Sequence, residues 1–221
     1  MRRVRARFAL AAGAAAVLSV ACARAPSLIT AEVSALDAQG PDSFSVHVVT
    51  SRGPFDVRVH RDWAPRGADR LYFLFKAHYY DGVRFFRVVD KFVAQFGLSG
   101  DTAVARAWRT RRIKDDPVLR SNVRGTIAFA KGDTNTRTTQ LFISYGDNSR
   151  LDATGFAVVA QVVEGMAVVD SLYKGYGEGA PRGKGPEQAR IGREGNAYLK
   201  KDFPLLDYIV TARIDREWHR P

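Results

Sequence analysis

The sequence has few of the residues on which many enzymes and small extracellular folds depend. It contains one cysteine, Cys22, among 221 residues, so disulfides within one chain cannot hold it together. Its histidines lie far apart and lack the spacing of metal ligands: His47, His60, His78 and His219. No serine, histidine and aspartate set occurs in a nucleophile-elbow context. These absences disfavour a hydrolase or a metalloenzyme, and we expect no metal and no cofactor.

The sequence also lacks an apolar run long enough to cross a membrane. An Ala-rich run from Phe8 to Ala21 has 14 residues, whereas a transmembrane helix needs about 20. It follows the basic segment MRRVRAR, which contains four arginines and no acid. A basic segment before a short apolar run is typical of a secretory signal. We therefore predict a signal peptide over residues 1–21 and an exported protein.

The single cysteine follows this run immediately, in LSVAC. The pattern resembles a bacterial lipobox, in which the cysteine is lipidated and becomes the mature N-terminus, although Ser19 stands where an aliphatic residue is usual. The alternative is ordinary cleavage after Ala23, with Ala21, Cys22 and Ala23 as the small-residue site. We favour lipidation of Cys22, which predicts a periplasmic or cell-envelope protein anchored to a membrane.

The formal net charge is +11, of which the four N-terminal arginines account for +4. The remaining positive charge is dispersed, and no helix-turn-helix or metal-finger spacing occurs, so no nucleic-acid partner is expected. The densest basic cluster is RAWRTRRIKDD, residues 106–116, which ends in two acids. We interpret it as a solvated loop or as a contact to an anionic surface.

Periodicity predicts short strands with two main helices. Residues 22–42 have no sustained period and are expected to form a tether. Residues 44–50 and 55–60 flank a turn and alternate as an antiparallel hairpin does, and residues 64–78 repeat as a core-packing helix with Pro65 in its first turn. Further strands are predicted over residues 126–130, 140–144, 155–163 and 208–214, helical segments over 165–173 and 188–201, a Gly- and Pro-rich surface loop over 174–188, and a tail over 215–221. This pattern favours a mainly β fold, a closed eight-stranded antiparallel β-barrel capped by two helices.

The stretch RFFRVVDKFVAQFG, residues 84–97, is the most aromatic hairpin of the chain, yet it contains Arg87 and Gln95. A two-residue loop, Asp90 and Lys91, would place Arg87 and Gln95 on opposite faces. A three-residue loop ending at Phe92 would place them opposite each other on one face. The second register forms a pocket with one cation and one amide on an apolar floor. From this stretch alone, Arg87 on a half-exposed strand facing water remains the ordinary alternative.

Three segments together resemble one known family. FFRVVDKFVAQFG, GTIAFAKGDTNTRTTQLFIS and NSRLDATGFAVVAQVVEGM are similar to cyclophilin-type peptidyl-prolyl cis-trans isomerases, in family order and with near-family spacing. The resemblance extends from about Phe44 to Arg213. It implies an isomerase domain over residues 43–214 with a barrel fold, and the insert over 174–206 resembles an elaboration of some bacterial members.

The resemblance implies the site residues and the activity. Arg87 corresponds to the catalytic arginine and Gln95 to the glutamine beside it, which favours the three-residue loop. The positions that correspond to substrate contacts are Phe92, Val93, Ala130, Lys131, Gln140, Phe142, Leu151 and Phe156. The implied function is rotation of X-Pro bonds in exported proteins, with Pro-containing segments of unfolded or folding proteins as partners. The alternative is a holdase of the same fold with weak turnover.

Four positions depart from the family pattern. Arg150 replaces a common tryptophan, Phe156 a histidine, Val93 a methionine and Lys131 an asparagine. Because the family tryptophan packs against cyclosporin, we expect weak cyclosporin binding, together with an altered peptide preference.

Overall fold

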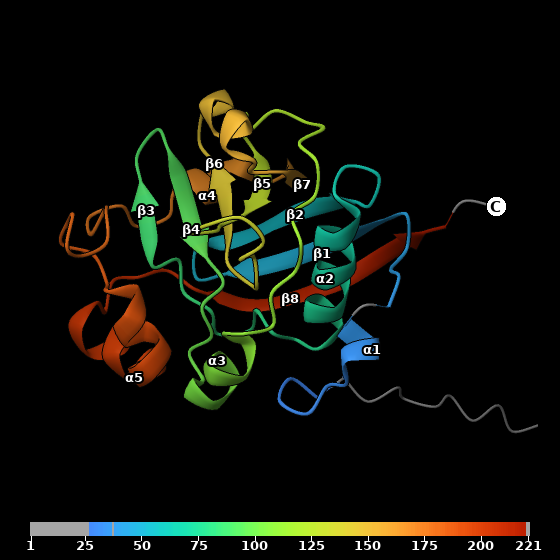
Figure 1. The fold of residues 1–221 in the computed structure, drawn as a ribbon. Coiled ribbons are helices and arrows are strands. Elements are labelled where there is room, and N and C mark those ends of the chain that lie inside the picture. The colour runs from blue at the N-terminus through green and yellow to red at the C-terminus, as the bar shows by residue number, and fades with distance from the viewer. Residues whose placement is uncertain (1–26, 37, 220–221) are drawn as a thin grey trace, which may run out of the picture.

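The computed structural model describes residues 27–36 and 38–219, so the predicted signal and Cys22 lie outside the described residues. Eight strands form one sheet in the order β3-β4-β6-β5-β7-β2-β1-β8, as Figure 1 shows. All the pairings between these strands are antiparallel. The strands are β1 (Ser43–Thr50), β2 (Gly53–His60), β3 (Arg87–Val89), β4 (Val93–Phe96), β5 (Thr126–Phe129), β6 (Leu141–Ser144), β7 (Val158–Glu164) and β8 (Ile209–Trp218).

The prediction of a mainly β, cyclophilin-like fold is confirmed, but that of a closed barrel is not supported. The edge strands β3 and β8 do not pair with each other along their length. Their ends meet where the chain before β3 approaches the start of β8, through an isolated bridge between Arg84 and Tyr208 and backbone hydrogen bonds such as that from Phe85 to Asp207, 2.9 Å. Closure depends on where two edges meet across more than 100 residues of chain, which local alternation does not encode.

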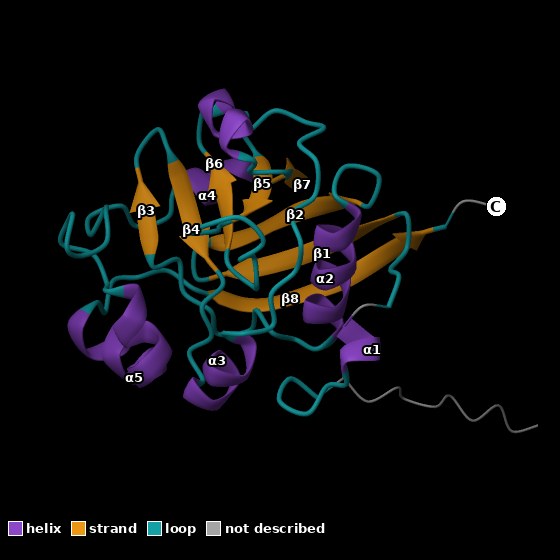
Figure 2. Ribbon diagram, viewed as in Figure 1, coloured by secondary structure: helices purple, strands orange, loops and turns teal. Residues whose placement is uncertain are grey.

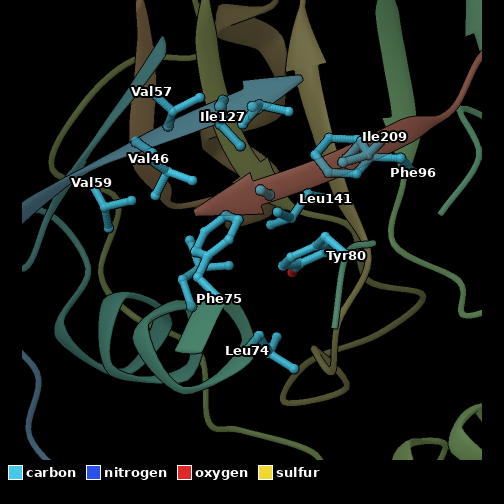
Figure 3. Close-up of a cluster of buried hydrophobic side chains, with 14 of the residues drawn as sticks. Val46, Val57, Val59, Leu74, Phe75, Tyr80, Phe96, Ile127, Leu141 and Ile209 are labelled. Carbon is cyan, nitrogen blue, oxygen red and sulfur yellow. The ribbon is translucent and has the colours of Figure 1, made fainter. Parts of the chain in front are cut away.

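The alternating hairpin and the first long helix both contribute buried side chains to the core, as predicted. On β2, Phe55, Val57 and Val59 are all buried. Helix α2 (Pro65–Lys76) lies across the sheet and has Pro65 in its first turn, where a missing N–H costs no hydrogen bond. Figure 3 shows Leu74 and Phe75 of this helix among the buried side chains of the strands. Burial of apolar area is therefore what holds α2 on the sheet.

The remaining helices are seen in Figure 2. They are α1 (Val33–Leu36), α3 (Thr102–Trp108), the 3-10 helix η1 (Ser149–Thr154), α4 (Met166–Asp170) and α5 (Gln188–Asp202). Helix α3 corrects the solvated loop predicted for the basic cluster, because Asp101 caps it by accepting hydrogen bonds from the backbone of Ala103 and Val104. No helix in the described part of the chain is long and apolar enough to span a membrane.

Both ends of the predicted domain are more ordered than expected. Within the predicted tether, α1 buries Leu36, and the backbone N–H of Gly40 donates to Asp69 of α2. At the other end, β8 continues through residues 215–218 of the predicted tail, with Trp218 opposite Ser43 on β1. Contacts with residues far away in the sequence hold both segments in place. Local periodicity cannot predict such contacts.

Candidate active site

The hairpin of β3 and β4 has the three-residue loop. Arg87 lies opposite Gln95, and Val89 lies opposite Val93, so Asp90, Lys91 and Phe92 form the turn. Lys91 has a φ of 57°, the left-handed conformation that such turns require at one position. The ordinary alternative, with Arg87 facing bulk water, is excluded, since only 17% of its side chain is exposed.

A chain of hydrogen bonds runs from the arginine on β3 through β4 to the residue just before β6. The Nη1 of Arg87 donates to the Oε1 of Gln95 at 3.0 Å, and the Nε2 of Gln95 donates to the Oε1 of Gln140 at 3.0 Å. Gln95 is buried, so its amide has little freedom to take another orientation. The chain therefore holds the guanidinium from one side and leaves other N–H groups of Arg87 for a ligand.

An apolar cluster lies beside this chain. Phe142 is 4% exposed, and its ring meets that of Phe156 edge to face, with centroids 5.7 Å apart. The whole cluster consists of Val93, Ala128 and Phe142, with Phe92, Ala130, Leu151 and Phe156 packed against it. The structure thus brings together all the predicted apolar contact residues, including Phe156.

Phe92 joins the cation to this cluster. The Cζ of Arg87 lies 5.3 Å from the centroid of the Phe92 ring, and that of Arg150 lies at 4.8 Å. The Phe92 carbonyl accepts two hydrogen bonds, from the backbone N–H of Tyr145 and from the Nδ2 of Asn148, both at 2.9 Å. Asn148 was not predicted as a site residue, because its contact is with a backbone carbonyl 56 positions away.

Two predicted substrate-contact residues, Ala130 and Lys131, directly follow β5. The backbone N–H of Ala130 is already used, since it donates to the Gln140 carbonyl at 2.9 Å. The Lys131 ammonium donates to Asp115 at 2.8 Å, and the Lys131 side chain is 9% exposed, so this lysine makes a structural contact and is not a free cation. Lys131 replaces an asparagine of the family pattern, but its pairing with Asp115 means that it adds little free positive charge to the rim of the site.

The residue that sequence reasoning missed is Glu178, in the insert predicted as a surface loop. Its carboxylate accepts from the Nε of Arg87 at 2.6 Å and from Nη2 at 2.8 Å. The hydrogen bonds from Arg87 lower the pKa of Glu178 below its ordinary value of 4.5, so the carboxylate is ionised at neutral pH. No local pattern could predict this contact, because its partners are 91 residues apart.

A larger cavity, about 750 Å³ in volume, lies next to Gln140, between α3, α5 and the loop before β6. Its rim is basic, with one aspartate, Asp133, against the arginines Arg106, Arg109, Arg112 and Arg193. These arginines are exposed. The cluster predicted to contact an anionic surface therefore lines a cavity beside the site.

The fold and the site together define a class: an antiparallel β protein with a sequestered cation held beside a slot of apolar side chains. In the described part of the chain, no group of three His, Cys, Asp or Glu side chains could hold a metal ion. The family model "Cyclophilin type peptidyl-prolyl cis-trans isomerase/CLD" matches residues 45–191, more than half of the chain. This chain belongs to that family.

Relatives of this chain lead to the same family. A peptidyl-prolyl cis-trans isomerase of Acinetobacter baylyi is 31% identical over 133 residues, which cover 58% of this chain and 70% of that protein. Peptidyl-prolyl cis-trans isomerase-like 3 of Mus musculus is 29% identical over 134 residues, or 59% of this chain and 82% of that protein. The predicted enzyme class, a peptidyl-prolyl cis-trans isomerase, is confirmed.

Solved structures support the fold. A cyclophilin type peptidyl-prolyl cis-trans isomerase of Cryptosporidium parvum superposes with a TM-score of 0.58 at 17% identity, covering 79% of this chain and 99% of that one. The same protein in the presence of the dipeptide ala-pro gives a TM-score of 0.57 at 18% identity, with 78% and 99% covered. At these identities the likeness concerns the fold alone.

Proposed function

We propose that this protein accelerates rotation about X-Pro bonds in exported or cell-envelope proteins, with Arg87 as the catalytic residue. The observation that carries the proposal is the place of Arg87: a largely buried guanidinium, hydrogen-bonded to Gln95, beside the apolar cluster around Phe142. The Cryptosporidium parvum relative studied with ala-pro is consistent with a proline-containing ligand.

The geometry suits the reaction because no bond is broken. Resonance gives the X-Pro amide a rotational barrier of about 18–20 kcal/mol, so exchange without a catalyst takes tens to hundreds of seconds. As the amide twists, the prolyl nitrogen regains its lone pair and becomes a hydrogen-bond acceptor. A permanently charged arginine directed at that nitrogen stabilises the twisted form more than either planar form.

The apolar cluster supplies the second requirement. Phe142, Phe92 and Leu151 hold the proline ring, while the carbonyl on the other side of the bond turns. They also exclude water, which strengthens the interaction of Arg87 with the developing lone pair. Gln95 keeps Arg87 in place, and Gln140 extends this polar edge toward the peptide backbone.

The test is isomerisation of a proline peptide by the domain with Arg87→Ala. Removal of a preorganised donor is expected to lower kcat/KM by on the order of 10²–10³-fold. The kcat/KM of Arg87→Lys is expected to lie between those of the parent and Arg87→Ala, because lysine keeps the charge but loses the planar fork of donors. Arg124→Ala is the matched control, since Arg124 pairs with Asp170 outside the site. An Arg87→Ala protein as fast as an active parent overturns the role of Arg87. A parent that binds unfolded chains but shows no turnover favours the holdase instead.

We also propose that the protein is lipid-anchored through Cys22 on the exported side of a membrane. The proposal rests on the basic segment, the short apolar run and the position of the cysteine. Mass spectrometry of the mature protein is expected to show a diacylglyceryl-modified Cys22 as the first residue. An unmodified N-terminus after Ala23 would contradict the lipid anchor but would still agree with export.

A further inference from the structure

The insert between α4 and α5 carries an acid into the site. In Figure 1 this orange segment passes β3 before it reaches α5. Glu178 binds Arg87 through both carboxylate oxygens, at 2.6 and 2.8 Å, and its own side chain is 35% exposed. Two parallel N–H to O contacts constrain the plane of the guanidinium and not only its distance.

From this geometry we propose that Glu178 is a positioning residue for catalysis: it fixes the plane of the Arg87 guanidinium for the twisting X-Pro bond. This inference rests on the proposed function and deepens it. Arginine has five N–H donors, and the contacts with Glu178 and Gln95 use three of them. One N–H on Nη1 and one on Nη2 remain for the substrate. Glu178 can therefore hold the guanidinium edge formed by Nε and Nη2 while the substrate contacts the remaining N–H groups of Nη1 and Nη2.

The insert is built to hold this carboxylate in place. The backbone N–H of Gly179 donates to the Oε1 of Glu178 at 3.1 Å, and that of Gly185 donates to the Glu178 carbonyl at 2.8 Å. A methyl group at Gly183 would overlap the same carbonyl, so the loop needs glycine where it folds back on Glu178. A residue held by its own backbone and by a neighbouring turn is suited to orient another side chain.

Two contacts outside the turn fasten the insert to the domain. The ammonium of Lys174 donates to Asp90, in the loop of the catalytic hairpin, at 2.8 Å. The ring of Tyr176 meets that of Phe203, at the end of α5, with centroids 5.0 Å apart. Both contacts precede Glu178 and the turn that includes Gly185 follows it, so the carboxylate does not depend on Arg87 alone for its place.

A carboxylate beside a catalytic cation has an opposing effect, because it offsets part of the positive charge. If that effect dominated, Glu178 would compete with the substrate, and its removal would raise the rate. The side-on geometry favours positioning, since an arginine free to rotate must be ordered anew for each substrate. Misplacement of a catalytic group by about 1 Å costs up to 10²-fold in rate.

The test compares Glu178→Ala and Glu178→Gln with Glu187→Gln. Glu187 is the matched control: it is an acid of the same insert, and it lies 3.8 Å from Arg193 and not at Arg87. We expect Glu178→Ala to lower kcat by on the order of tenfold with KM within about twofold. Glu178→Gln should recover part of the rate, because its amide oxygen still accepts from Arg87. A rise in kcat, or no change, in Glu178→Ala overturns the proposal.

A second measurement does not depend on activity. In the parent protein and in Glu187→Gln, the Nε–H of Arg87 is expected to give a distinct, slowly exchanging NMR signal. In Glu178→Ala that signal should broaden or move to the position of solvent-exposed arginines. An unchanged signal means that Glu178 does not hold Arg87. If the signal behaves as expected but the parent shows no turnover, the proposed function fails while the contact stands.

Discussion

At the scale of single residues, the site depends on how few polar groups it has and on how each is held. Arg87 has a carboxylate on one edge and an amide on another, while Phe92 lies within cation–π distance. The neighbouring Arg150 also lies against Phe92, but it is exposed. One cation is therefore fixed inside the site, and a second one covers its rim, at the position where the family resemblance implies a common tryptophan.

The rim position predicts a change in drug binding. Arg150→Trp is expected to strengthen cyclosporin binding by roughly tenfold, because an aromatic contact adds about 0.5–1.5 kcal/mol beyond the area it buries. Calorimetric titration of the parent and the variant measures this directly. Arg120→Trp is the control, since Arg120 is also exposed but lies over Trp63, away from the site. Equal affinities for the parent and Arg150→Trp would show that this rim position does not limit the drug.

At the scale of the elements, alternation and apolar repeats predicted most strands and α2, because each of these elements has one buried face. Helix α3 was missed, since four arginines between residues 106 and 112 obscured an ordinary N-cap at Asp101. For the candidate site, strand periodicity alone left two registers open, and only the family resemblance favoured the correct one. Glu178 was beyond both arguments, because a Gly- and Pro-rich segment has no period and its fold depends on distant partners.

At the end of β4, Gly97 lies very close to the segment before β6. Gly97 has a φ of 103°, and a methyl group there would overlap the carbonyl of Thr139 and lie 2.8 Å from the Cα of Gln140. Gly97→Ala is therefore expected to lower the free energy of unfolding by at least about 1–3 kcal/mol and to displace Gln140. Gly132→Ala is the control, since a methyl group there meets nothing within 4 Å.

Chemical denaturation of the two variants measures the difference. A loss confined to Gly97→Ala would show that the fold requires the close approach of β4 to the segment that contains Gln140. Similar stability for both variants would mean that the turn relaxes without cost, and the polar edge of the site would then not depend on this glycine.

At the scale of the whole molecule, a group of exposed arginines lies beside the candidate site. The arginines that line the cavity beside Gln140 come from α3, from the segment just after it and from α5. Gln140 itself is two hydrogen bonds from Arg87. A peptide extended from the site toward Gln140 therefore enters a positive field. Such a field attracts acidic segments and repels basic ones, and salt screens it over about 10 Å at 0.1 M ionic strength.

This distribution predicts a charge-dependent substrate preference. Of two proline peptides that differ only in a flanking Glu or Lys, the acidic one is expected to show a kcat/KM several-fold higher at low salt, and salt should reduce the ratio. Arg106→Ala combined with Arg109→Ala should remove most of the preference, while Lys201→Ala, an exposed cation of α5 that does not line the cavity, should keep it. A ratio unaffected by salt and by the arginines would mean that substrates leave the site by another route. The preference is expected in KM more than in kcat, because these arginines contact the flank of the peptide and not the bond that turns.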